Sequence, residues 1–126
     1  MPPQKILIVD NEAQILEHLR NLLTASGWNV ITAINGKDAL EKVKTSRPDA
    51  IVLDMIMPEM DGFQVARSLK SDPDYRSIPI VAATSLSTCA DRDRCLTAGC
   101  DDYVAKPFTV AQLEQRLAVL FADSAF

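Results

Sequence analysis

Four side chains in this sequence have the chemistry to receive a phosphoryl group together: Asp10, Asp54, Thr84 and Lys106. Magnesium prefers hard oxygen ligands such as carboxylates and keeps several of its waters, and a carboxylate can accept a phosphoryl group covalently as an aspartyl phosphate. A metal ion and a lysine offset the charge on phosphoryl oxygens, while a hydroxyl hydrogen-bonds one of them. With the amide of Asn11 beside Asp10, these residue types predict a site for magnesium and a phosphoryl group if the fold brings them together.

Each of these positions follows a short apolar run that we predict to be a strand. The runs are continuous and rich in β-branched residues, which is typical of strands covered on both faces. The expected strands are residues 6–9, 30–33, 50–53, 80–83 and a short one around 103–104.

Segments with the period of a helix separate these runs. The first carries an apolar stripe before the stop at Ser26-Gly27. Its members are Ile15, Leu16, Leu19, Leu22 and Leu23. Further helices are expected after Asn35-Gly36, over Gly62–Lys70, from about Thr88 to Ala98, and from about Val110 to Phe121.

Five strands that alternate with five helices predict an α/β fold, in which a parallel sheet is covered on both faces. Right-handed crossovers then allow few topologies. At 126 residues the chain has the usual size of one domain. Because sites in such doubly wound sheets form beyond the carboxyl ends of the strands, the four polar positions are expected to converge there.

Two longer segments carry a resemblance to a known family. Residues 54–62, DMIMPEMDG, resemble the phosphoacceptor segment of response-regulator receiver domains, and residues 98–108, AGCDDYVAKPF, are similar to the last-strand signature of that family. The resemblance covers nearly the whole chain. It implies one flavodoxin-like (βα)5 receiver domain over residues 1–126, with strand order 2-1-3-4-5 and no effector domain, that acts as a switch in a two-component system.

The resemblance also implies a role for each matching residue. Asp54 would be the nucleophile and the phosphorylated residue, Thr84 would bond the incoming phosphoryl group, and Lys106 would pair with its charge. Tyr103 would be the rotating aromatic that responds to Thr84. The Lys106–Pro107 bond would be cis, which costs little when the second residue is proline.

The resemblance places Mg²⁺ among Asp10, Asn11, Asp54 and the backbone carbonyl of Ile56. The family usually has two acidic residues after the first strand, whereas the second is here Asn11. An amide oxygen can still ligate magnesium but brings no charge, so weaker metal binding is expected. Ser85 stands where the family favours a smaller residue.

The resemblance also places two aliphatic residues beside the phosphoryl group, where they would affect its lifetime. They are Ile56 and Leu86, two positions after the phosphoacceptor and two after the threonine. Hydrolysis needs a water aligned with the phosphorus, and neither side chain can hydrogen-bond one. Slow autodephosphorylation is therefore expected.

The implied phosphodonor is a histidine kinase or a phosphotransfer protein. The implied output is an effector, or a second copy of the chain, bound by the fourth helix, fifth strand and fifth helix.

A net charge of −4 argues against direct nucleic-acid binding. No apolar run approaches the ~18 residues of a membrane span, so a cytoplasmic protein is expected. The spacing of Cys89, Cys95 and Cys100 does not suit zinc, and reduced thiols are expected.

Other interpretations of the same residues remain at this point. Asp10 and Asp54 taken singly are compatible with caps of the turns or helices that follow them. A phosphohydrolase of the haloacid dehalogenase type would use Asp10 as nucleophile but would want an aspartate where Glu12 stands. A receiver-like module that is never phosphorylated has only Asn11 in its favour. Whether the chain acts alone or is part of a larger protein is left open.

Overall fold

The computed structural model describes residues 4–85 and 89–124, in which strands and helices alternate along the chain. The elements are β1 (Lys5–Val9), α1 (Ala13–Ala25), β2 (Asn29–Ala33), α2 (Gly36–Ser46), β3 (Ala50–Asp54), α3 (Gly62–Lys70), β4 (Ile80–Thr84), α4 (Cys89–Thr97), β5 (Asp102–Ala105) and α5 (Val110–Ser124).

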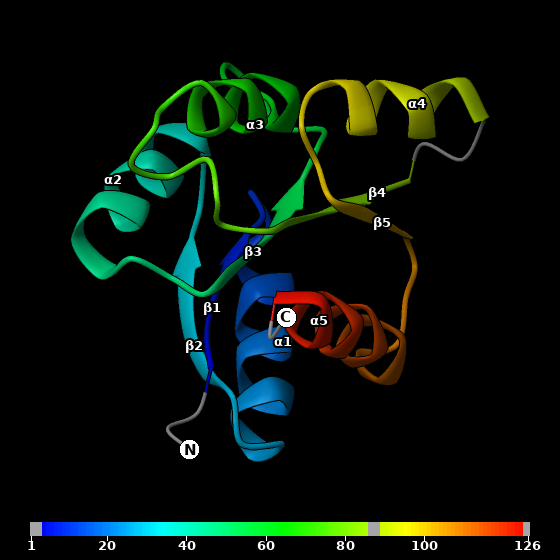
Figure 1. Ribbon diagram of the computed structural model, residues 1–126. Coiled ribbons are helices and arrows are strands. Elements are labelled where there is room, and N and C mark those ends of the chain that lie inside the picture. The colour runs from blue at the N-terminus through cyan, green and yellow to red at the C-terminus, as the bar shows by residue number, and fades with distance from the viewer. Residues whose placement is uncertain (1–3, 86–88, 125–126) are drawn as a thin grey trace.

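In this part of the chain the strands form one sheet of five in the order β2-β1-β3-β4-β5, and every neighbouring pair is parallel. Figure 1 shows α1 and α5 on one side of the sheet and α2, α3 and α4 on the other. The predicted fold class and strand order are therefore confirmed. The strand order reverses between β1 and β3, which is where doubly wound sheets usually bind their ligands.

Each face of the sheet has its own hydrophobic core because side chains alternate along the strands. From β3, Ile51 and Leu53 pack on the side of α2, α3 and α4, whereas Val52 packs on the side of α1 and α5. The three are at most 2% exposed. Burial on both faces explains why these strands are continuously apolar in the sequence.

The predicted apolar stripe of α1 is wrong at one position. Leu16, Leu19 and Leu23 are buried and Ile15 is half-buried, but Leu22 is 40% exposed. Residues 16, 19 and 23 follow the period of one helix face, and position 22 lies about 100° away from position 23 around the helix axis. A run of two leucines did not reveal which one faces the core.

An aromatic brace joins the first half of the chain to the last helix. Trp28 lies just before β2, and its indole N–H donates to Glu114 Oε2 of α5 at 2.9 Å. The Trp28 ring also stacks on Phe121, with ring centroids 6.0 Å apart. Trp28 thus fixes α5 against α1 at the amino-terminal end of the strands.

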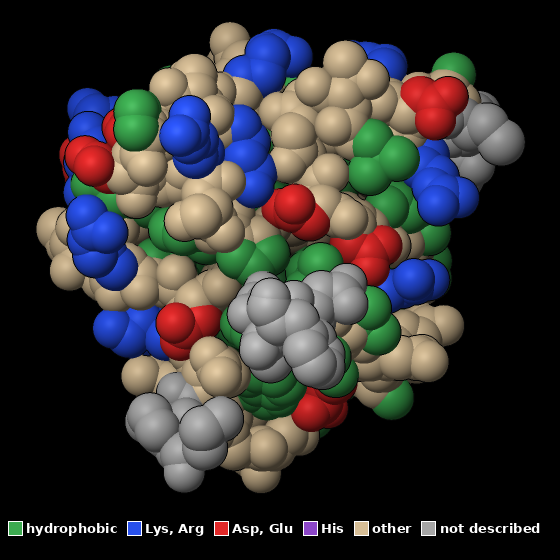
Figure 2. All heavy atoms as spheres, in the orientation of Figure 1, with side chains coloured by type: hydrophobic (Ala, Val, Ile, Leu, Met, Phe, Trp, Pro, Cys, Tyr) green, Lys and Arg blue, Asp and Glu red, His purple; other side chains and the backbone are tan. Residues whose placement is uncertain are grey.

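The surface carries charges of both signs. Figure 2 shows Lys and Arg side chains over α2 and α3 with acidic side chains among them on the face in view. None of the helices in residues 4–85 and 89–124 is long and apolar enough to cross a bilayer.

Candidate functional site

The polar residues predicted to converge lie at the carboxyl end of the sheet. Asp54 and Thr84 are the last residues of β3 and β4. Asp10 follows β1, and Lys106 follows β5. Because parallel strands end at the same edge of a sheet, four separate segments of the chain place one polar side chain each into a single region.

The Lys106 ammonium lies between two buried carboxylates. Lys106 Nζ donates to Asp10 Oδ2 at 2.9 Å and lies 3.4 Å from Asp54 Oδ2. Asp10 and Asp54 are only 3% and 5% exposed. One cation contacting two carboxylates confirms that the three residues meet, and it leaves a net charge of −1 on the trio.

Backbone N–H groups occupy the other oxygen of each carboxylate. Glu12 N donates to Asp10 Oδ1 at 2.9 Å, and Ile56 N donates to Asp54 Oδ1 at 3.1 Å. The helix after Asp10 begins at Ala13 with no side-chain cap, so Asp10 closes a turn before the helix and is not its N-cap. Both carboxylates are fixed in orientation by their own following turn and by Lys106.

Burial raises the pKa of Asp54, although the hydrogen bond from Ile56 N and the charge of Lys106 act in the opposite direction. For Lys106, burial opposes the ammonium form, but the hydrogen bond and charge of Asp10 outweigh it, so the pKa of the ammonium is raised. Lys106 therefore remains a cation at neutral pH.

Gly62 holds the start of α3 directly against the end of β3. A Cβ atom at Gly62 would lie 2.5 Å from the carbonyl oxygen of Asp54 and 2.6 Å from Met55 Cα, and Gly62 N donates to Met55 O at 3.1 Å. Asp61 and Gln64 form a capping box at the same helix start. No larger residue fits at position 62 unless the backbone of the Asp54 segment moves.

A second glycine supports the segment that follows Asp54. A Cβ atom at Gly36, the first residue of α2, would lie 2.8 Å from Met60 Cγ and 2.9 Å from the Met60 carbonyl oxygen. The neighbouring residue Glu59 has a φ of 68°, which is unusual for a residue other than glycine. Gly36 and Met60 thus join the start of α2 to the segment between β3 and α3, a contact that the sequence did not reveal.

The donor set is chemically suited to magnesium. Asp10 and Asp54 already share one cation, Lys106 Nζ, so their oxygens lie close enough to share another. Asn11 is exposed beside Asp10, and Ile56 follows Asp54 by two residues. Within the described ranges no three His, Cys, Asp or Glu side chains form a metal cluster, so two carboxylates are the charged ligands this site offers.

The remaining predicted residues border this arrangement. Thr84 is fully buried, and its carbonyl accepts from Lys106 N at 2.8 Å. The Lys106–Pro107 peptide bond is cis. Tyr103 is half-buried against the core on the α4 side of the sheet, and Ser85 is exposed. Leu86 lies outside the described residues.

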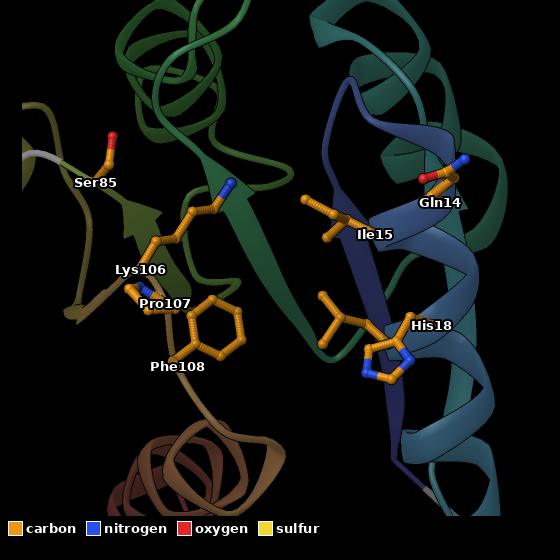
Figure 3. A pocket seen from close by; sticks show the side chains of 8 residues that line it. Gln14, Ile15, His18, Ser85, Lys106, Pro107 and Phe108 are labelled. Atoms are coloured by element: carbon orange, nitrogen blue, oxygen red, sulfur yellow. The ribbon is translucent and has the colours of Figure 1, made fainter.

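A groove next to Lys106 was not expected from the sequence. It has a volume of about 460 Å³ and lies between α1 and the segment after β5. Figure 3 shows Ile15 and His18 of α1 on one side and Pro107 and Phe108 on the other, with Lys106 above. The sequence shows that Ile15 belongs to an apolar stripe and that Phe108 follows a proline. It does not show that these two residues line one groove, because their proximity depends on the packing of α1 against α5.

Comparison with known proteins agrees with this geometry. The model of the response regulator receiver domain family matches residues 6–118. The chain belongs to the response-regulator receiver family. Members of this family are signalling switches of two-component systems.

Named relatives share most of the chain. Response regulator MprA of Mycolicibacterium vanbaalenii is 40% identical over 118 residues, which cover 94% of this chain and 50% of that protein. The probable transcriptional regulator ycf27 of Pyropia yezoensis is 43% identical over 114 residues, 90% of this chain and 46% of that protein. The receiver therefore spans about half the length of these curated relatives.

A solved relative contains the metal. The receiver domain of sensor histidine kinase PA1611 from Pseudomonas aeruginosa, with a magnesium ion coordinated in its active-site cleft, superposes with a TM-score of 0.83 at 33% identity. The match covers 91% of this chain and 94% of that one.

Removing the buried carboxylate of Asp54 should stabilise the fold at neutral pH. A pKa that is raised on folding means that the native state holds the proton more tightly than the unfolded chain does. Ionised Asp54 therefore lowers the free energy of unfolding at about pH 7, and this cost is absent below the ordinary aspartate pKa of about 3.9. We expect Asp54→Asn to raise the free energy of unfolding near pH 7 and to change it little near pH 3, measured by urea denaturation.

Asp74→Asn is the matched control, because Asp74 is exposed and should show no such gain. A loss of stability in Asp54→Asn that appears near pH 7 and vanishes near pH 3 would mean that the attraction of Lys106 outweighs burial, contrary to this prediction.

Proposed function

We propose that Asp54 is the phosphoacceptor of this receiver and that residues 1–126 form one such domain. A carboxylate oxygen of Asp54 attacks the phosphorus of the donor. An O–P bond forms, the bond from phosphorus to the donor atom breaks, and the donor atom keeps that electron pair. When bound, magnesium would offset charge on the phosphoryl oxygens.

The observation that supports this most is the position of Lys106. Its ammonium lies 3.4 Å from Asp54 Oδ2. From this position it can pair with the negative charge of a phosphoryl group attached to that oxygen. Thr84, at the end of the adjacent strand, would donate its hydroxyl to a phosphoryl oxygen. Asp10 would hold magnesium together with Asp54, the Asn11 amide and the Ile56 carbonyl.

Phosphorylation would alter the face formed by α4, β5 and α5. Lys106 directly follows β5, and Tyr103 lies within it, so a change at either residue reaches an edge strand of the sheet. An effector or a second copy of the chain would bind this face. The phosphodonor would be a histidine kinase or a phosphotransfer protein, and the apolar groove beside Lys106 offers it a surface next to Asp54.

The test is phosphorylation by acetyl phosphate with magnesium, followed by intact mass. We expect one adduct of about 80 Da in the parent chain and none in Asp54→Asn, whereas Asp74→Asn should behave like the parent. An adduct of normal stoichiometry in Asp54→Asn refutes the assignment. Turnover of many donor equivalents without an adduct would instead indicate a phosphohydrolase.

Magnesium should bind more tightly when position 11 is acidic. One added charge near a divalent ion contributes roughly 1 to 4 kcal/mol per unit-charge pair at ~4 Å, and an open site lies near the low end. We expect Asn11→Asp to tighten magnesium at least several-fold, measured by calorimetry. Trp28 fluorescence is a poor probe here because Trp28 lies at the opposite end of the strands.

Asn21→Asp, an exposed position on α1, adds the same charge away from the site and should leave magnesium affinity unchanged. Equal affinities for Asn11→Asp and the parent would place the side chain of residue 11 outside the metal site.

The phosphoryl group should be long-lived because Ile56 cannot hold a water for hydrolysis. This side chain is 52% exposed beside Asp54, so it borders the approach to the phosphorus without offering a hydrogen bond. We expect Ile56→Asn to speed dephosphorylation roughly tenfold. The reason is that a hydrogen bond from Asn to the attacking water would lower the activation free energy by about 1 to 2 kcal/mol. Phosphorylated protein freed of donor is followed by intact mass with magnesium saturating.

Val119→Asn makes a similar change at an α5 side chain that is also 52% exposed. It should not alter the lifetime. If Ile56→Asn loses its phosphoryl group at the parental rate, alone and with Leu86→Glu, the two aliphatic residues do not control the lifetime.

A further inference from the structure

Two buried thiols lie at the junction between α4 and β5, outside the site described above. Cys95 is fully buried in the last turn of α4, and Cys100 is 5% exposed just before β5. Both are free cysteines. Neither is among the residues proposed above for phosphoryl transfer.

The end of α4 brings the backbones of these two residues together. Cys100 N donates to Cys95 O at 3.1 Å, Gly99 N donates to Leu96 O at 3.0 Å, and Gly99 has a φ of 110°. This hydrogen-bond pattern is the Schellman motif, in which the side chains at the positions of Cys95 and Cys100 commonly contact each other. The Cα atoms of disulfides are usually about 4.4 to 6.8 Å apart, a separation compatible with this direct backbone bond.

Cys100 lies in a turn that close packing and hydrogen bonds attach to neighbouring elements. A Cβ atom at Gly99 would lie 2.5 Å from Lys70 Cγ, so the turn packs tightly on the side chain of Lys70. Lys70 Nζ bonds Asp101 Oδ2 at 3.0 Å, and the same oxygen accepts from Ile80 N at 2.8 Å. These bonds fasten the residues around Cys100 to α3 and β4.

Cys95, in contrast, lies on a helix that buries little apolar side chain within its described residues. It is the only buried side chain among the described residues of α4, and the rest of that helix is highly charged. Its neighbour Arg94 lies over the ring of Phe63 with the guanidinium 4.4 Å from the ring centroid. Figure 1 shows α4 at the outer end of its layer, beyond α3. A helix that buries so few apolar side chains opens more readily than one with a full apolar stripe.

From this geometry we propose that Cys95 and Cys100 form a dithiol site that is oxidised to an intramolecular disulfide by small disulfides such as oxidised glutathione. One thiolate attacks the small disulfide, which gives a mixed disulfide and releases one small thiol. The second protein thiolate then attacks the mixed disulfide at the protein sulfur and releases the second small thiol. The two protein thiols lose two protons and two electrons, and the small disulfide is reduced to two thiols.

Reaction requires an opening of α4. Burial and the neighbouring Cys95 thiol raise the pKa of Cys100 to about 12, and burial raises the pKa of Cys95 as well. The closed protein therefore presents little thiolate, and exchange is slow until α4 moves away. The product would fasten the last turn of α4 to the start of β5, two elements of the proposed output face.

Peptide mapping of the oxidised full chain tests this site. The folded protein is treated with oxidised glutathione, quenched with acid, and digested with trypsin. Cleavage after Arg76 and Arg92 leaves Cys89 in one peptide, residues 77–92, and cleavage after Arg94 and Arg116 leaves Cys95 and Cys100 in another, residues 95–116. We expect the 95–116 peptide to lose about 2 Da, the mass of two hydrogens.

Cys100→Ala is the matched control and should stop at a glutathione adduct on Cys95, with Cys95→Ala as the reciprocal variant if the first folds poorly. The proposal is overturned if the parent keeps stable glutathione adducts on residues 95–116, or if peptides 77–92 and 95–116 become cross-linked. It is also overturned if both thiols stay free in the folded chain but oxidise in urea.

Discussion

The arrangement of the site depends on one ammonium group shared by two buried carboxylates. Two carboxylates at the end of one sheet repel each other, and burial makes each charge more costly. Lys106 Nζ, 2.9 Å from Asp10 and 3.4 Å from Asp54, offsets both. Because Asp10 and Lys106 come from opposite ends of the chain and Asp54 from its middle, these contacts also tie β5 to β1 and β3 across the site.

The glycines around the site show how the backbone supports this charge cluster. Gly62 allows α3 to begin against the last residue of β3, and Gly36 allows Met60 to lie on the start of α2. The segment after Asp54 is therefore held from two sides by close backbone contacts.

Much of this could be predicted from the sequence because burial on both faces makes the strands continuously apolar. A polar residue at the end of such a run, as with Asp54 and Thr84, marks the edge of the sheet where sites form. Features that depend on packing between helices were not predictable. The sequence did not show that Leu22 faces solvent or that Ile15 and Phe108 line one groove, nor that Lys106 lies nearer to Asp10 than to Asp54.

The brace around Trp28 bears on where the folded unit stops. The segment that identifies the family ends at residue 118, yet Phe121 stacks on Trp28 beyond that point. The indole also reaches Glu114 across a separation of 86 residues in the chain, so α5 closes the domain by contacts with its first third. The packed domain therefore extends beyond the segment that identifies the family, and its last helix belongs to the same core as its first.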